Sequence, residues 1–162
     1  MSDIIRLVLV IFLLTIGLVA YFLVVNALFS QRVAKTKSII QSMPARSFGI
    51  GLVNFVFFTV IALVLFSAAE NMGPFIRGIL VIPAIVILAF LAIVLSLGLT
   101  SMSILIGERV FSDFSPWKQT LWGTACLSLG SALPFVGWFL LLPYAGFVGI
   151  GAVILGFFQR NA

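Results

Sequence analysis

The longest uncharged stretch of the chain, residues 120–158, limits the possible folds more than any other feature. One helix needs about 20 apolar residues to cross a hydrocarbon core about 30 Å thick, and this stretch is nearly twice as long. Pro134 and Gly137 interrupt it near its middle, because proline cannot continue a helix and glycine allows a sharp turn. The stretch therefore predicts a helical hairpin in lipid, with arms over residues 116–132 and 138–158.

The composition of the 162-residue chain is that of a membrane protein throughout. Apolar residues make up 63% of the chain and charged residues 8%, with a mean hydropathy of +1.34, whereas soluble domains contain about 25% charged residues. We expect a single integral membrane domain, residues 1–162, in contact with membrane lipids. The net charge of +5 comes from loops between apolar stretches, so we expect no nucleic-acid partner.

The predicted fold is an all-α, multi-pass transmembrane helical bundle that ends in the Pro/Gly-turned hairpin. Five stretches are predicted to span the bilayer, at about residues 4–29, 48–69, 78–106, 116–132 and 138–158. At 1.5 Å per residue the fourth stretch is about 25 Å long, which is barely enough to cross. Three spans followed by a re-entrant hairpin therefore remain an open alternative.

The distribution of basic residues predicts the orientation. If residues 30–47 are cytoplasmic, all of the nine Lys and Arg residues except Arg6 and Arg77 lie inside, as the positive-inside rule requires. The expected orientation has the N-terminus outside and Arg160, near the C-terminus, in the cytoplasm. A re-entrant hairpin would leave Arg160 on the same side, so charge does not separate the two arrangements.

The first basic loop carries the candidate contacts for anionic lipid headgroups. These residues are Arg32, Lys35, Lys37 and Arg46. Val33, Ile39 and Ile40 recur among them at roughly helical spacing, which favours a short amphipathic helix at the membrane interface. A solvated basic loop that only fixes the topology explains the same charges, and both interpretations stay open here.

Small residues in the hairpin are the candidate helix-packing and interaction positions. They form a stripe on the first arm and two pairs spaced by four residues on the second: Thr124, Ser128, Ala145, Gly149, Ala152 and Gly156. Close backbone approach and interhelical hydrogen bonds drive helix association in lipid, where apolar burial between helices contributes little. We expect the small and polar residues 96–103 to pack against this hairpin, and Pro134 and Gly137 to form its turn.

No group of residues in the sequence predicts catalysis. The chain contains no histidine, which removes the commonest metal ligand and the commonest general base, and we expect no cofactor, metal or small-molecule substrate. Cys126, the single cysteine, is predicted to be a packing residue. The leading hypothesis is a non-enzymatic accessory or scaffold subunit that associates with itself or with other membrane proteins. The alternative is a small oligomeric channel or proton-coupled exporter that uses Glu70.

The second half of the chain contains an ordered series of short motifs. They are IGERVF at residues 106–111, PW at 116–117, LPFVGW at 133–138 and GIGA at 149–152. This series resembles the small integral-membrane domain that bacteria often attach to bactofilin-type polymer-forming cytoskeletal proteins. The resemblance implies a membrane anchor or scaffold in the bacterial inner membrane, and it carries over no catalytic residues. No β-repeat polymerising segment accompanies the motifs in this chain.

Overall fold

A computed structural model of the chain describes residues 2–133 and 135–158, with side chains from residue 5 onward, and these residues form helices without a strand. The helices are α1 (Ser2–Leu28), α2 (Ser30–Ser42), α3 (Pro44–Glu70), α4 (Pro74–Val110), α5 (Pro116–Ala132) and α6 (Leu142–Phe158), with a π-helical segment η1 (Val136–Leu141) leading into α6. The predicted all-α class is confirmed for these residues.

Three of the helices begin with proline. Pro44, Pro74 and Pro116 occupy the first turns of α3, α4 and α5, where the missing N–H costs no hydrogen bond and the fixed φ favours the helix. The start expected at Pro116 is confirmed, and the third apolar stretch, expected from residue 78, is already helical from Pro74. The second apolar stretch, expected from residue 48, is already helical from Pro44.

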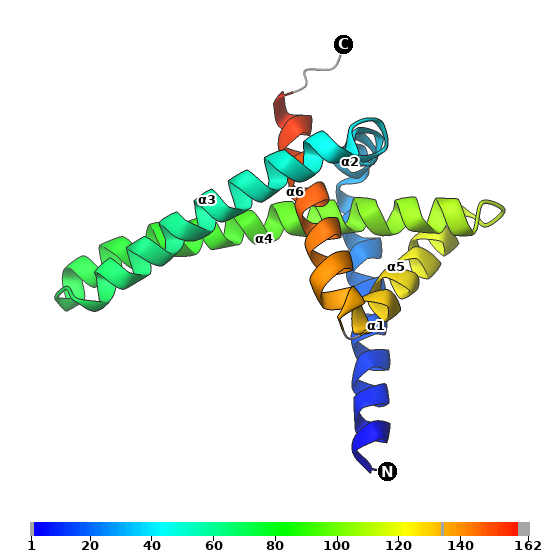
Figure 1. Ribbon diagram of the computed structural model, residues 1–162, viewed down its shortest axis with the longest axis horizontal. Helices are drawn as coiled ribbons and strands as arrows, with labels where there is room; N and C mark the ends of the chain where they lie inside the picture. Colours follow the sequence, from blue (N-terminus) through cyan, green and yellow to red (C-terminus); the bar gives the residue numbers. More distant parts are fainter. Residues whose placement is uncertain (1, 134, 159–162) are drawn as a thin grey trace.

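Helix α6 is the centre of the packing. In an 18-residue apolar window within Val136–Phe158, 56% of the residues are buried, against 11–17% in the corresponding windows of α1, α3 and α4. Helices α2, α3 and α4 all contact α6. Figure 1 shows α3 and α4 as an antiparallel pair that runs across α6 and projects beyond it, and we call this projecting pair, residues 52–92, the α3–α4 arm.

Four described helices are long and apolar enough to cross a membrane: residues 5–28, 44–70, 74–110 and 136–158. Helix α5 has 17 residues and is not one of them, so the structure supports a helical membrane bundle without supporting five spans. Helix α4 has 37 residues and is therefore about 55 Å long. Because the hydrocarbon core measures about 30 Å, α4 exceeds it and must tilt or extend into the interface.

The turn between α5 and η1 differs from the expectation. Pro134 lies outside the described residues. The positive φ belongs to Phe135 (φ 67°, ψ −64°), the one non-glycine residue with positive φ in the described part of the chain, and such a backbone is uncommon for a bulky side chain. Gly137 has a different role from the one predicted. A Cβ there would lie 2.5 Å from the Ser131 carbonyl oxygen, so the glycine allows η1 to contact the end of α5.

Candidate functional site

The first basic loop was expected to be either an amphipathic helix or a solvated loop. The structure has a helix there, α2, over residues 30–42. Its apolar side faces the protein: Val33, Ile39 and Ile40 are buried against α4 and α6. The hydroxyl of Ser101 on α4 also donates a hydrogen bond to the Val33 carbonyl at 3.2 Å. Helix α2 is therefore anchored to the bundle through its apolar side.

The four basic candidates occupy different environments. Arg32 stacks over the Phe157 ring, 4.8 Å from its centroid, and Arg46 is exposed. Lys35 is partly buried and has an interaction partner. Lys37 forms an ion pair with Glu108, 2.6 Å between Nζ and Oε1. Lys37 therefore has an acidic partner within the chain, and its contact with lipid headgroups stays a prediction.

Glycines form the contact between α4 and α6. A Cβ added to Gly98 would lie 2.5 Å from the backbone carbon of Gly149, and one added to Gly149 would lie 2.8 Å from the backbone of Gly98. Carbon atoms prefer separations of about 3.5–4.0 Å. Neither position has room for a side chain, so the backbones of α4 and α6 are in direct contact at these two glycines.

Two more crossings use glycine in the same way. Where α3 crosses α6, a Cβ on Gly51 would overlap the Phe147 carbonyl, and one on Gly151 would overlap the Ser47 carbonyl. Where α4 crosses α5, a Cβ on Gly123 would overlap the Ser103 carbonyl. The expectation that residues 96–103 pack against the hairpin agrees with these contacts.

The predicted packing residues lie inside this network. Thr124, Ala145 and Ala152 are 0–1% exposed, and Gly149 and Gly156 are buried. Ser128 is half-buried, and its hydroxyl lies 2.8 Å from that of Thr15 on α1. The small residues of the hairpin therefore contact other helices of the same chain.

A polar junction lies where α1, α2, α4 and α5 meet. This hollow of about 250 Å³ is lined by the Lys37–Glu108 pair and by the polar side chains of Asn26, Ser30, Gln119 and Thr120. The two charged side chains are 25% and 34% exposed. Sequence reasoning did not find this site, because Lys37 and Glu108 are 71 residues apart and neither belongs to a recognisable motif.

The polar junction retains hydrogen-bonding capacity. The hydroxyl of Thr120 donates to the Pro116 carbonyl, and the Gln119 amide donates to the carbonyls of Phe111 and Ser112. Within residues 2–133 and 135–158, no hydrogen bond involves the side chain of Asn26, and the ion pair uses only Oε1 of Glu108. A ligand in the hollow could therefore form hydrogen bonds with the ammonium of Lys37 and with the second carboxylate oxygen of Glu108.

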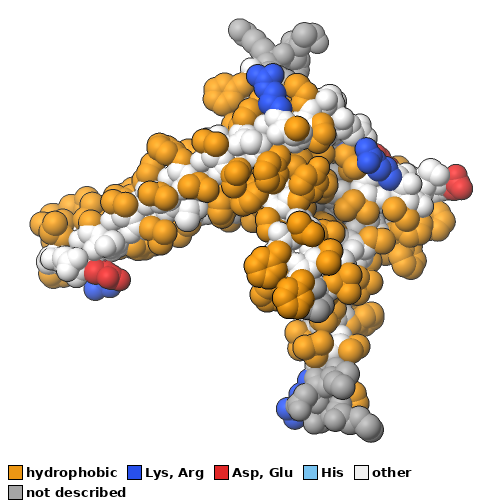
Figure 2. All heavy atoms as spheres, viewed as in Figure 1, with side chains coloured by type: hydrophobic (Ala, Val, Ile, Leu, Met, Phe, Trp, Pro, Cys, Tyr) orange, Lys and Arg blue, Asp and Glu red, His pale blue; other side chains and the backbone are white. Residues whose placement is uncertain are grey.

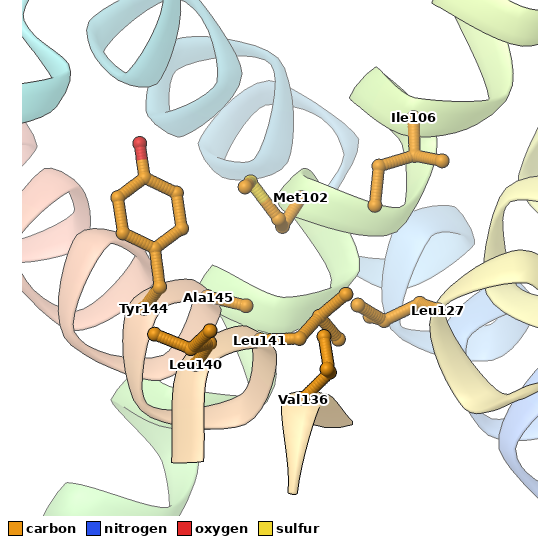
Figure 3. A pocket seen from close by; sticks show the side chains of 8 residues that line it. All are labelled: Met102, Ile106, Leu127, Val136, Leu140, Leu141, Tyr144 and Ala145. Carbon is orange, nitrogen blue, oxygen red and sulfur yellow. The ribbon is translucent and has the colours of Figure 1, made fainter. Parts of the chain in front are cut away.

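Three other features lie outside the polar junction. Glu70, the residue of the exporter alternative, is exposed at the last residue of α3. A second hollow, of about 450 Å³, lies between α4, α5, η1 and the start of α6. Figure 3 shows the apolar side chains that line it, such as Met102, Leu127 and Leu141, together with Tyr144. Cys126 is exposed on α5, so it does not pack inside the bundle as expected.

Comparisons with protein-family models, curated proteins and solved structures find no match to this chain. The resemblance of residues 106–158 to the bactofilin-associated membrane domain therefore stays a prediction.

Proposed function

We propose that this chain is a non-enzymatic, multi-pass membrane protein that acts as an accessory or scaffold subunit, with the α3–α4 arm as its surface for another membrane protein or for a second copy of itself. The observation that carries the proposal is that two apolar helices, paired with each other, project beyond α6 with large side chains exposed (Figure 1). Large apolar side chains of the arm are exposed, and α1, α2 and α5 do not cover them. Examples are Val53 at 67%, Phe57 at 58% and Ile82 at 65% exposure. Figure 2 shows hydrophobic side chains along the whole visible length of the arm.

The inner seam of the arm supports a stable, preformed surface. The fully buried residues between its two helices are mostly alanines: Ala62, Ala69 and Ala84 are 0–2% exposed. Phe58 of α3 and Phe90 of α4 add an edge-to-face ring contact, 5.9 Å between centroids. Small residues at the seam let the backbones approach, so the arm presents its larger side chains outward on a rigid support.

The proposed orientation is N-terminus outside and C-terminus in the cytoplasm, in a bacterial plasma membrane. It is supported by the contact of Arg32 on α2 with Phe157 at the end of α6. This contact brings the end of α6 to the basic helix α2, as expected if both lie on one side of the bilayer. The five-span arrangement and the re-entrant hairpin both accommodate it.

Site-specific photocrosslinking in cells tests the proposed function. A photoreactive residue at Val60 or Ile82, both exposed on the arm, is expected to give a discrete crosslinked protein band. The matched position is Leu9 of α1, which is 55% exposed and is expected to give lipid adducts only. Discrete bands from Leu9 together with none from the arm would refute the assignment of the arm.

A further inference from the structure

We propose that the polar junction binds the phosphoethanolamine group of a membrane lipid, with the phosphate on Lys37 and the primary ammonium on Glu108. The inference requires only that the protein lies in a membrane, and it is independent of whether the α3–α4 arm binds a partner. It rests on the charge pattern of the hollow: one cation and one anion, 2.6 Å apart, among neutral polar groups.

The two charged groups have capacity left for a zwitterion. An ammonium has three donors and a carboxylate has two acceptor oxygens, whereas the Lys37–Glu108 contact uses one of each. A phosphate oxygen can therefore accept a hydrogen bond from Lys37, while the ligand ammonium donates to Oε2 of Glu108. The side-chain amide of Asn26, which has no partner among the described residues, lies on the α1 side of the same hollow.

The position of the junction favours a lipid as the source of this group. The hollow is formed by the end of α1, the start of α5 and Glu108 near the end of α4. These helix ends also carry Arg109, Trp117 and Lys118, the residue types that gather at the boundary between hydrocarbon and headgroups. A volume of about 250 Å³ is smaller than the roughly 300–1,000 Å³ of pockets for drug-sized ligands, and it suits a headgroup whose acyl chains stay outside.

The chemistry predicts selectivity among lipids. A primary ammonium donates hydrogen bonds to Glu108, whereas the quaternary ammonium of phosphatidylcholine has no N–H to donate. Phosphatidylglycerol lacks the ammonium and brings its negative charge close to Glu108. We therefore expect phosphatidylethanolamine to bind more tightly than either of the other two lipids. The expected difference in dissociation constant is about tenfold, which is the effect of one hydrogen bond to a charged group.

The test is native mass spectrometry of the full chain, released from detergent with each of the three lipids at matched chain length and concentration. Phosphatidylethanolamine should remain bound preferentially to the wild type. Glu108→Gln should reduce its binding to the level of the other two lipids, and Lys37→Met should reduce the binding of all three. The matched controls are Asp113→Asn and Arg46→Met, which remove exposed charges outside the junction and should leave the preference unchanged.

Asn26→Leu separates ligand binding from folding, because it removes the amide from the hollow with little change in side-chain shape and keeps the Lys37–Glu108 pair. It should weaken the binding of phosphatidylethanolamine while thermal stability in detergent stays near that of the wild type. Equal binding of the three lipids to the wild type, or a preference that survives Glu108→Gln, would overturn the proposal. Competition by soluble glycerophosphoethanolamine at the same concentration as the lipid would show a soluble ligand and would overturn the assignment to a membrane lipid.

Discussion

Replacing Gly149 with alanine tests whether the α4–α6 glycine contact holds the bundle together. The added Cβ would lie 2.8 Å from both the carbonyl carbon and the Cα of Gly98, whereas carbon atoms prefer about 3.5–4.0 Å. Both neighbours are helix backbone and cannot rotate away, so α4 and α6 must separate by about 1 Å at this point. The separation also loosens the neighbouring contacts of α6 with α3.

The expected loss of stability follows from two opposing effects. Overpacking of this kind costs about 1–3 kcal/mol, and the rigid backbone on both sides places it near the upper end. Alanine recovers about 1 kcal/mol through its higher helix propensity. The net expectation for Gly149→Ala is a loss of about 2 kcal/mol in the free energy of unfolding, which lowers the equilibrium constant for folding about 30-fold.

The assay is reversible unfolding of the purified protein in mixed micelles by titration with sodium dodecyl sulfate, followed by circular dichroism. Gly156→Ala is the matched control on α6, because its Cβ would lie 3.5 Å from the flexible end of Ile39, an ordinary contact. We expect this control to be neutral or slightly stabilising. If Gly149→Ala is as stable as Gly156→Ala, the close approach of α4 and α6 does not support the fold.

A double-mutant cycle sharpens the same test. Gly98→Ala alone should also destabilise, because its Cβ would lie 2.5 Å from the Gly149 backbone. Once the first Cβ has separated the two helices, the second enters a gap that already exists. The double variant should therefore lose less stability than the two single variants added together, by an interaction free energy of about 0.5–3 kcal/mol. Strict additivity would mean that the two glycines do not face each other.

Three further predictions concern other contacts of the bundle and its orientation. Gly51→Ala should destabilise the protein in the same titration while Gly49→Ala, two residues away with nothing within 4 Å of its Cβ, should not; equal effects would contradict the α3–α6 contact. Thr15→Val removes the 2.8 Å hydrogen bond to Ser128 and should cost about 0.6 kcal/mol, the average for interhelical hydrogen bonds in lipid; in a Ser128→Ala background it should cost less, because only the bond of Thr15 to the Ile11 carbonyl is then lost. In a Cys126→Ser background, an impermeant thiol reagent outside intact cells should label Met72→Cys and leave Gln41→Cys unlabelled, both positions being exposed; the opposite pattern would reverse the proposed orientation.

The positions of the helices were largely predictable from local signals. Long uncharged stretches and prolines at their starts are properties of neighbouring residues, so the bounds of α5, residues 116–132, agree with the prediction at both ends. The number of spans was less predictable because 17 residues lie near the minimum needed to cross a bilayer. The positive φ of Phe135 was not predictable, since a neighbouring proline and a nearby glycine both offered a simpler turn.

The contacts between distant parts of the chain were the main gap. Gly149 was expected to pack against a helix, but its partner Gly98 became known only from the fold. Lys37 was expected to contact lipid, and its ion pair with Glu108 joins α2 to α4 across 71 residues. Charge counts assign residues to loops and sides of a membrane, but they contain no information about which loops meet. The polar junction was therefore beyond sequence reasoning of this kind.

The positions of the glycines indicate which kind of contact a partner of the α3–α4 arm would make. The glycines of α6 that contact backbone, Gly149 and Gly151, face α4 and α3 of the same chain, so these close-approach surfaces are already occupied. Gly78 on the arm and Gly17 on α1 have open space beside them, but each is surrounded by large exposed side chains such as Ile79 and Ile16. A partner of the α3–α4 arm would therefore meet mainly Leu, Ile, Val and Phe side chains. Since lipid tails are equally apolar, recognition at the arm must come from the fit of these side chains into a matching surface.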